Sequence, residues 1–541
     1  MARSLAKSGA FSTLYVMYGS AAAFAATLIV SNGVGEAGAG AFFQIMAFFA
    51  IAISLSVFGA DTGLVRTISA QRALGRYHML PKLLRFAFIP ATLFALLLTL
   101  AALALALPQI SPDLSDQQRT AIFVAAPFLI FATWMTLCFG ALRGLGHTVE
   151  FTFLQSALLP TLRILAVGLA VFLSGSMIYL ALAWSLPVIL VLLLALIWVR
   201  RYMPAQTGIV RYRPRHMAGN QAQEDQAAEK KDASQQANQQ PTPSQAAAPA
   251  PAASQPAPAA ASLETAKSFW AFSSARGVSA MVETVLEWID VLLIGLFLGP
   301  AASGIYGAVN RCVRVGAMVE HTARVVTGPE ISAAIALADR QKASRIFVSA
   351  TQILICVGWP FFISLAAFGH LILGFFGSGF TAGAPLFYII GAAMLVQMAA
   401  GGVQSVLLMS GKARWQLYNK LTALALALTL NLTLIPLWGL QGAATAWAAA
   451  VLADCGLATY QVYMILGIRP QLKEVLPIMA LAGGTPALGA GILLFLLGTS
   501  WWALLAYLLL VMPLYLLLIY RFRSKVGLEK LVNSFTRKLR R

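Results

Sequence analysis

Long runs of apolar residues, separated by short polar connections, set the pattern of this chain. The run from Phe86 to Leu107 is unbroken, and a helix needs about 20 apolar residues to cross a bilayer. Runs of this length predict α-helices rather than the short alternating strands of a membrane barrel. Fourteen transmembrane helices are predicted, at 10–30, 39–62, 86–107, 120–141, 150–173, 179–199, 269–298, 304–327, 346–367, 383–409, 417–436, 442–466, 476–497 and 502–520.

Composition supports an all-α integral membrane protein. Of the 541 residues, 59% are hydrophobic and only 11% are charged, whereas a soluble domain has about 25% charged residues. A soluble enzyme with a single anchor is therefore excluded. The four cysteines lie inside apolar runs without a CxxC spacing, so we expect packing residues rather than disulfides, and no metal site.

The net charge of +19 is distributed unevenly. If the N-terminus is cytoplasmic, 31 of the 38 Lys and Arg residues fall in the termini or in connections on that same side. The connections on the other side contain only Arg119. Because basic residues gather on the cytoplasmic side of membrane proteins, both termini are predicted inside and no nucleic-acid partner is needed. The first apolar run is expected to be a retained span rather than a cleaved signal peptide.

A segment rich in Ala, Gln, Pro and Ser, from Gln221 to Ala261, interrupts the spans. It has almost nothing to bury, which favours a disordered cytoplasmic linker. The predicted organisation is an N-terminal lobe at 1–200, a linker at 201–268, a C-terminal lobe at 269–466, two further spans at 467–520 and a basic cytoplasmic tail at 521–541.

The two halves show signs of an internal repeat. The second span starts near Gly35–Phe42 and the eighth near Gly299–Tyr306, each with a turn of small residues closed by an aromatic residue. Each of these spans ends in a basic amphipathic stretch suited to the cytoplasmic surface. Two parallel six-span repeats, each forming one lobe beside a midplane cavity, are a recurring plan of transporters.

Three segments resemble recurring patterns of bacterial polysaccharide flippases in the multidrug/oligosaccharidyl-lipid/polysaccharide exporter superfamily. They are Gly299–Arg311, Pro436–Ala446 and Ser56–Arg66. The resemblance implies two pseudo-symmetric six-helix lobes in a V around a central cavity, with two C-terminal helices outside. It also implies transfer of an undecaprenyl-diphosphate-linked oligosaccharide from the inner to the outer leaflet. The long linker departs from the family pattern and leaves an added role open.

Ionisable residues inside the membrane cost about 2.5–3.5 kcal/mol each, so they pair or line water. The densest set lies on spans seven and eight: Glu283, Glu287, Asp290, Arg311, Arg314, His321 and Arg324. Counting from the turn between the spans places Asp290 level with Arg311, Glu287 with Arg314, and Glu283 with His321. Two interpretations stay open: structural ion pairs, or a cavity wall in which an arginine leaves its carboxylate to bind diphosphate.

Other candidates lie outside this hairpin. Asp61 and Arg66 are spaced unfavourably for a tight pair; Arg66 either follows the positive-inside pattern or captures the diphosphate at the cytoplasmic mouth. Arg163 has no acid on its own helix and is predicted to be an unpaired cavity arginine. Arg143 is expected to be a loop charge. Asp454 is a lone acid that either bonds a neighbouring helix or couples transport to an ion.

These observations favour a flippase for a lipid-linked saccharide in the bacterial cytoplasmic (inner) membrane. No nucleotide-binding, metalloprotease or catalytic-triad motif is present, so we expect neither an enzyme nor an ATP-driven pump, and no cofactor. Coupling to H⁺ or Na⁺, and partnership with a polysaccharide polymerase or glycosyltransferases, are left open. The alternatives are a cation-coupled multidrug antiporter with an acidic cavity, a membrane-embedded polysaccharide polymerase or ligase, and a non-transporting assembly partner.

Overall fold

The computed structural model describes residues 2–110, 116–203, 266–337, 339–409, 413–467 and 472–523, which contain helices and turns but no strand. The first helices are α1 (Ala2–Val57), α2 (Ala60–Ala73), η1 (Tyr77–Met79), α3 (Leu80–Leu105), α4 (Asp116–Ala125), α5 (Phe128–Gly144), α6 (Thr148–Phe153), η2 (Leu154–Leu158), α7 (Leu159–Leu173) and α8 (Met177–Tyr202). The remainder are α10 (Ala266–Leu298), α11 (Pro300–Ala336), α12 (Arg340–Gly374), η3 (Ser378–Gly383), α13 (Leu386–Ala400), α14 (Val403–Met409), α15 (Ala413–Leu466), α16 (Leu472–Leu497), α17 (Trp501–Ala506), η4 (Tyr507–Val511) and α18 (Met512–Arg521).

The predicted all-α membrane protein is confirmed. Within the described ranges, 8 helices are long and apolar enough to cross a membrane, or 9 if α4 and α5 form one bent span. The helices α10 and α11, which carry several ionisable residues, are not among them. The count of fourteen spans stays a prediction. The linker predicted at 201–268 lies outside the described residues except at its ends, and so does most of the tail predicted at 521–541.

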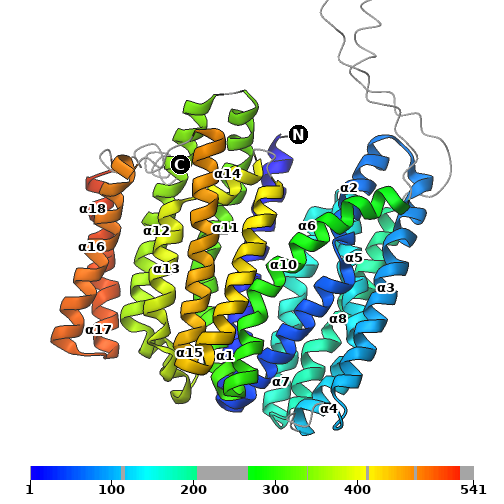
Figure 1. Ribbon diagram of the computed structural model, residues 1–541, viewed down its shortest axis with the longest axis horizontal. Coiled ribbons are helices and arrows are strands. Elements are labelled where there is room, and N and C mark those ends of the chain that lie inside the picture. The colour runs from blue at the N-terminus through cyan, green and yellow to red at the C-terminus, as the bar shows by residue number, and fades with distance from the viewer. Residues whose placement is uncertain are drawn as a thin grey trace, which may run out of the picture.

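Two glycines allow a single long helix to cover two predicted spans. Gly35 in α1 has a φ of 66° and Gly439 in α15 a φ of 59°, and this left-handed region is readily reached only by glycine. In Figure 1, α1 descends from the N-terminus and rises again toward α2, and α15 reverses direction in the same way. Of the two predicted turns of small residues, the one at Gly35 is the break within α1, and the other begins at Gly299, which has a φ of 86° and separates α10 from α11.

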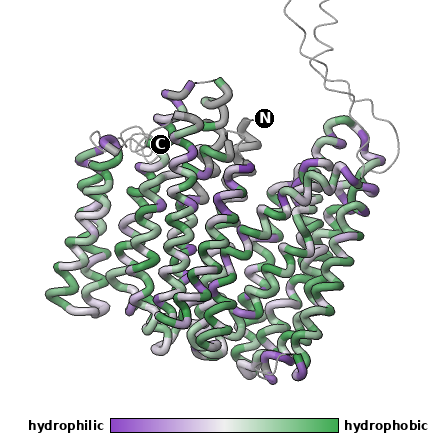
Figure 2. The backbone as a smooth tube through the Cα atoms, in the orientation of Figure 1, coloured by the Kyte–Doolittle hydropathy of each residue, from purple (hydrophilic) through white to green (hydrophobic). Residues whose placement is uncertain are grey.

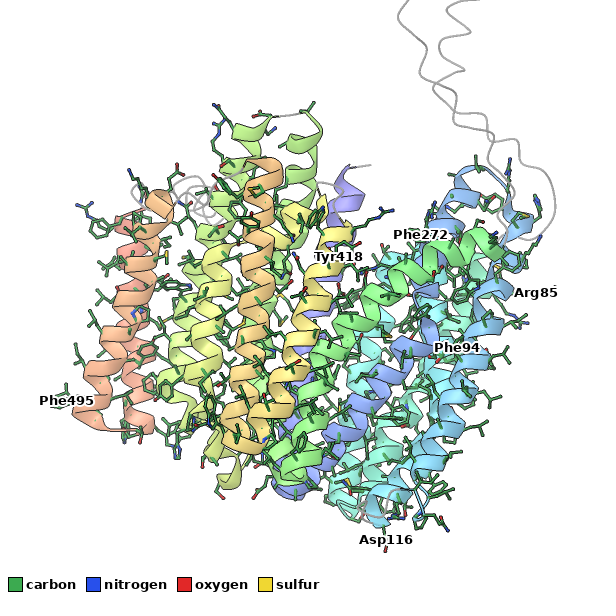
Figure 3. The ribbon with its side chains drawn as sticks, in the orientation of Figure 1. Arg85, Phe94, Asp116, Phe272, Tyr418 and Phe495 are labelled. Carbon is green, nitrogen blue, oxygen red and sulfur yellow. The ribbon has the colours of Figure 1, made fainter. Side chains whose placement is uncertain are left out.

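The bundle has two chemically different ends. The start of α1, the end of α18 and Arg85 lie at one end, and Asp116 lies at the other (Figures 1 and 3). Figure 2 shows hydrophobic residues along the lengths of the helices and hydrophilic residues gathered toward these ends. We call the end with Arg85 and the start of α1 the basic end, and the end with Asp116 the opposite end.

The N-terminal group of helices, α1 to α8, and the C-terminal group, α10 to α15, meet through a shared hydrophobic core. One cluster joins residues such as Phe43 of α1 and Leu180 of α8 to Tyr306 of α11 and Phe387 of α13. Toward the basic end, the two groups spread apart (Figure 1). Since α1 packs along both α10 and α11, these three helices form the contact between the groups.

The helix α10 is divided between the two groups. Phe269, near its start, is fully buried in a core built from α2, α3, α5 and α8, and Trp270 Nε1 donates a hydrogen bond to the carbonyl of Phe86 at 3.0 Å. Its second half, including Val291, packs in the shared core. The first turns of α10 therefore pack on the N-terminal helices, although the sequence assigns the residues from 269 onward to the C-terminal lobe.

The C-terminal helices lie at the side of the bundle. Figure 1 shows α16, α17 and α18 together at the edge, beyond α12 and α13. Of these, α16 packs against α12, and Tyr515 of α18 donates a hydrogen bond to the carbonyl of Cys356 at 2.7 Å. This agrees with the expectation of two peripheral C-terminal spans.

Candidate functional site

A cavity of about 300 Å³ lies between the two groups of helices. One wall is formed by α1, η2 and α7 and the other by α11. The α11 wall carries Arg311 and Arg314, while no carboxylate is found among the described residues that line the cavity. The charged side chains in this lining are therefore cationic, which favours an anion over a cation as a ligand.

Arg314 has a carboxylate partner beside the cavity. Its guanidinium forms a hydrogen-bonded ion pair with Glu287 of α10 and also reaches the Glu287 carbonyl at 3.5 Å. Both side chains are partly exposed, at 32% for Arg314 and 45% for Glu287. The predicted pairing of Glu287 with Arg314 from equal depth is confirmed, and the exposure leaves the pair accessible to a competing anion.

Arg311 forms no direct ion pair in the part of the chain that the structure describes, although Glu287, the partner of Arg314, is close enough to attract it. Its guanidinium instead lies over the rings of Trp288, at 5.2 Å, and Phe43, at 5.9 Å. Arg314 lies over the same Trp288 at 4.9 Å. Since Arg311 and Arg314 are three residues apart on one helix, they share a face, and cation–π contacts with one indole orient both.

Asp290 does not face Arg311, so that predicted match is wrong. Its carboxylate is 3% exposed and accepts hydrogen bonds from Tyr306, at 3.1 Å, and Asn431, at 2.8 Å. Equal depth along two helices does not fix the direction around the helix axis, and Asp290 points toward α15. The Asn431 Oδ1 atom is buried without a described partner.

A second cavity of about 300 Å³ lies within the C-terminal helices and is more acidic. Its lining includes Glu283, Glu320, Lys420 and Asp454. Asp454 forms an ion pair with Lys420 at 2.7 Å and accepts a hydrogen bond from Gln404 of α14, which confirms the expected bonding to a neighbouring helix. Lys420 lies in the part of α15 before the break at Gly439, and Asp454 lies in the part after it. The sequence pattern does not show that these two residues meet.

Arg163 is not among the residues that line the first cavity. Its guanidinium stacks on Trp184 at 3.8 Å, and its Nε donates to the Trp184 carbonyl at 3.2 Å. No carboxylate partner is found for it among the described residues. The prediction of an unpaired arginine agrees with this geometry, but the side chain is fixed against α8 rather than directed at the cavity lining.

Near the basic end, Asp61 and Arg66 have separate partners. Asp61 pairs with Arg143 at 2.9 Å, and Arg66 is an exposed residue that lies over the Phe272 ring of α10 at 4.2 Å. The expectation that Asp61 and Arg66 do not form a tight pair is confirmed. The expectation that Arg143 is a loop charge is wrong, because it lies in the last turn of α5 and packs on Phe151 at 4.8 Å.

Replacing Asp61 by Asn is expected to destabilise the N-terminal helices by about 1 kcal/mol, because it leaves the partly buried Arg143 without its counter-charge. Thermal unfolding of the purified protein measures the effect. In a double-mutant cycle with Arg143→Gln, the combined loss should be smaller than the sum of the two single losses. Additive losses would contradict the pairing.

His321 and Arg324 lie in α11, but their side chains are outside the described part of the structure. Their roles, and the depth match of His321 with Glu283, stay predictions. Glu283 itself lines the second cavity. No cluster of three or more His, Cys, Asp or Glu residues able to hold a metal ion occurs among the described residues.

Several lining residues escape prediction from sequence. Gln155, Ser156 and Ser20 face the first cavity, and Glu320 and Lys420 line the second. The polar neutral residues stand out little in an apolar run. Pro160, five residues after Gln155, is the one local signal, since a proline disturbs the hydrogen bonds of the preceding turn.

Part of the chain matches a protein family. Residues 252–385 match the family described as "Polysaccharide biosynthesis protein". A probable low-salt glycan biosynthesis flippase, Agl15 of Haloferax volcanii, is 22% identical over 215 residues. That match spans 40% of this chain and only 46% of the relative.

Solved structures of flippases and transporters have a similar fold. The lipid II flippase MurJ, in an inward closed conformation, aligns with a TM-score of 0.66 and 10% identity, covering 95% of this chain and 99% of MurJ. An inward-facing multidrug resistance transporter of the MATE family in the MOP superfamily aligns with a TM-score of 0.57 and 13% identity, covering 82% of this chain and 94% of that one. The predicted resemblance to this superfamily is confirmed at the level of the fold, and the proteins named here are flippases and transporters. The chain therefore has the fold of the MOP-superfamily membrane transporters.

Proposed function

We propose that the protein is a flippase that moves an undecaprenyl-diphosphate-linked oligosaccharide from the inner to the outer leaflet of the cytoplasmic membrane, for surface polysaccharide biosynthesis. The observation that carries the proposal is the cavity between the lobes, which presents Arg311 and Arg314 and no described carboxylate. Planar guanidinium groups bind phosphate oxygens through paired hydrogen bonds. The relatives described as flippases support the same conclusion.

In this proposal, the two arginines act in sequence. Arg311, stacked on Trp288 and without a direct ion pair among the described residues, contacts the diphosphate first. The second phosphate then displaces Glu287 from Arg314. Alternating access of the two lobes carries the head group across, while the prenyl chain stays in lipid because its transfer into water is unfavourable.

Leaflet transfer in proteoliposomes tests the function. An undecaprenyl-diphosphate oligosaccharide should become accessible to a membrane-impermeant glycosidase on the opposite face, faster with the protein than in protein-free vesicles. No acceleration over protein-free vesicles, with or without an imposed H⁺ or Na⁺ gradient, would contradict the proposal.

Replacing Glu287 by Gln is expected to tighten binding of undecaprenyl diphosphate about three- to tenfold, because the variant removes the anion that competes for Arg314. Binding to the purified protein measures the change. Asp116→Asn, at the opposite end of the bundle and outside both cavities, is the control and should bind as the unaltered protein does. Weaker binding by Glu287→Gln would show that Glu287 assists the substrate instead.

The basic end is proposed to face the cytoplasm, which places the termini inside and the cavity mouth beside the leaflet where lipid-linked saccharides are assembled. The positive-inside pattern supports this orientation, and the lobes spread apart at that end (Figure 1). Glycosyltransferases and a polysaccharide polymerase are the expected functional partners on either side of the transfer step.

A cation gradient is the proposed energy source. Two places away from the arginines offer oxygen atoms to H⁺ or Na⁺. One is the buried Asp290, beside Tyr306 and an Asn431 Oδ1 atom without a described partner. The other is the second cavity, with Glu283 and Asp454. Buried carboxylates at membrane depth are costly and persist where they serve ion pathways. This separation lets the anion and the coupling cation bind without competing.

We expect Asp290→Asn to abolish the acceleration of transfer by an imposed H⁺ or Na⁺ gradient, reducing the rate to that without a gradient. Asparagine keeps the size of the side chain but cannot carry the charge. Transfer with and without each gradient measures the effect, and Asp116→Asn at the opposite end is the control. A full gradient response in Asp290→Asn would exclude Asp290 from coupling.

A multidrug antiporter of the same fold is the main alternative, and the acids of the second cavity are the observation that favours it. An antiporter for cationic drugs needs carboxylates where the drug binds. In this protein they lie within the C-terminal helices, whereas the cavity between the lobes is cationic. A polymerase or ligase gains no support, because the named relatives are transporters.

A further inference from the structure

The wall of the cavity opposite the arginines is built around a widened helical turn. Residues Leu154–Leu158 form a π-helical turn in which Leu159 N–H donates to the Leu154 carbonyl, five residues back. Pro160 has no N–H to offer the carbonyl of Ser156, four residues before it, and this missing bond accounts for the widening. Such single-turn bulges are frequent at functional sites.

The turn presents uncharged hydrogen-bonding groups to the cavity. The exposed Gln155 side chain lines the cavity and has no hydrogen bond in the part of the chain that the structure describes. Ser20, on the same wall, donates its hydroxyl to the Val16 carbonyl at 3.1 Å, which leaves its oxygen free to accept. No ionisable side chain lines this wall in the described residues.

The wall is held in place by close contacts. A Cβ atom at Gly19 would collide with the Ser156 carbonyl, so α1 and the π-helical turn touch backbone to backbone. Beside them, the Tyr18 hydroxyl and Thr161 Oγ1 share a hydrogen bond of 2.8 Å. The Gln155 amide therefore extends from a fixed backbone, as preorganised recognition requires.

We propose that the two walls bind different parts of the substrate: the α11 arginines hold the diphosphate, and Gln155, with Ser20, hydrogen-bonds the first sugar attached to it. An amide both donates and accepts, which matches the hydroxyl and acetamido groups of a hexosamine ring. An uncharged wall selects for a neutral first sugar, because a sugar carboxylate there would lack a counter-charge and be drawn instead to the arginines. This inference rests on the proposed flippase function and names the part of the substrate that the N-terminal lobe binds.

Binding of two probes to the purified full-length protein tests the inference. The probes are undecaprenyl diphosphate and undecaprenyl diphosphate carrying one N-acetylhexosamine, with phosphatidylcholine as the reference lipid. The unaltered protein should prefer the sugar-bearing probe, and Gln155→Ala should lower that preference about three- to tenfold, as expected for one or two lost hydrogen bonds. Ser20→Ala should lower it in the same direction.

Control variants separate this inference from the proposed function. Arg314→Gln should weaken binding of both probes and keep their ratio, while Gln441→Ala, an exposed glutamine of α15 outside both cavities, should match the unaltered protein. Equal binding of the two probes by the unaltered protein, or an unaltered ratio in both Gln155→Ala and Ser20→Ala, overturns the inference alone. Failure of the unaltered protein to bind either probe more tightly than phosphatidylcholine overturns the proposed function itself.

Discussion

Replacing both Arg311 and Arg314 by Gln is expected to slow leaflet transfer of an undecaprenyl-diphosphate oligosaccharide by at least about a hundredfold. Each lost hydrogen bond to a charged group costs about 1.5–3 kcal/mol, and tenfold in affinity corresponds to about 1.4 kcal/mol. Two such losses in one cavity give the hundredfold figure at their lower limit. Both side chains lie on the same face of α11 and stack on the same indole. The double variant therefore removes both cations from this wall of the cavity.

The matched control is Arg276→Gln, because Arg276 is an exposed residue of α10 that does not line the cavity. It should transfer lipid at the normal rate. Thermal unfolding should show that the double variant folds, since glutamine retains the apolar part of each side chain. A folded double variant with normal transfer would remove the two arginines from the mechanism.

Replacing Gly40 by Val is expected to hold the opposite end of the bundle open and to abolish transfer. Gly40 of α1 packs directly on the carbonyl of Pro300 and against Gly304 of α11, while Gly304 packs on the carbonyl of Glu36. A Cβ atom at either glycine would overlap backbone atoms of the other helix, which cannot move aside as a flexible side chain would. These contacts join the two predicted turns of small residues, one from each half of the chain.

Cysteine labelling measures this opening. Ala39→Cys, introduced where the residue is 0% exposed in the shared core and in a background without the four native cysteines, should resist a membrane-impermeant maleimide. Adding Gly40→Val should make it reactive. Gly168→Val is the control, since a Cβ atom there meets nothing within 4 Å. Continued protection of the cysteine in Gly40→Val, together with normal transfer, would show that this contact does not close the opposite end.

The helices are predictable because the length of an apolar run is a property of the sequence alone. The long run from Phe86 to Leu107 falls almost entirely in α3, and the small-residue turn at Gly35 became a break within α1. The pattern of apolar residues does not show which distant segments pack together. The first turns of α10 look like the start of a new lobe in the sequence, yet Phe269 and Trp270 find their partners among the N-terminal helices.

The candidate site was predictable only in part, and for a geometric reason. Distance from a turn gives the depth of a residue, which correctly paired Glu287 with Arg314. It does not give the direction around the helix axis, so the sequence places Asp290 level with Arg311, whereas in the structure Asp290 accepts a hydrogen bond from Asn431. Gln155 could not be identified, because its exposure to the cavity depends on the π-helical turn before Pro160 and on which helix lies opposite.

Protection of a cavity cysteine by lipid ligands tests the central claim most directly. Ala23 lines the cavity between the lobes, and a cysteine at this position, in the cysteine-free background, reports whether a ligand occupies the space beside the arginines. Undecaprenyl diphosphate should protect Ala23→Cys from a maleimide, and the lipophilic cation tetraphenylphosphonium should not. Protection by tetraphenylphosphonium but not by undecaprenyl diphosphate would contradict an anion-binding cavity and favour a cation transporter.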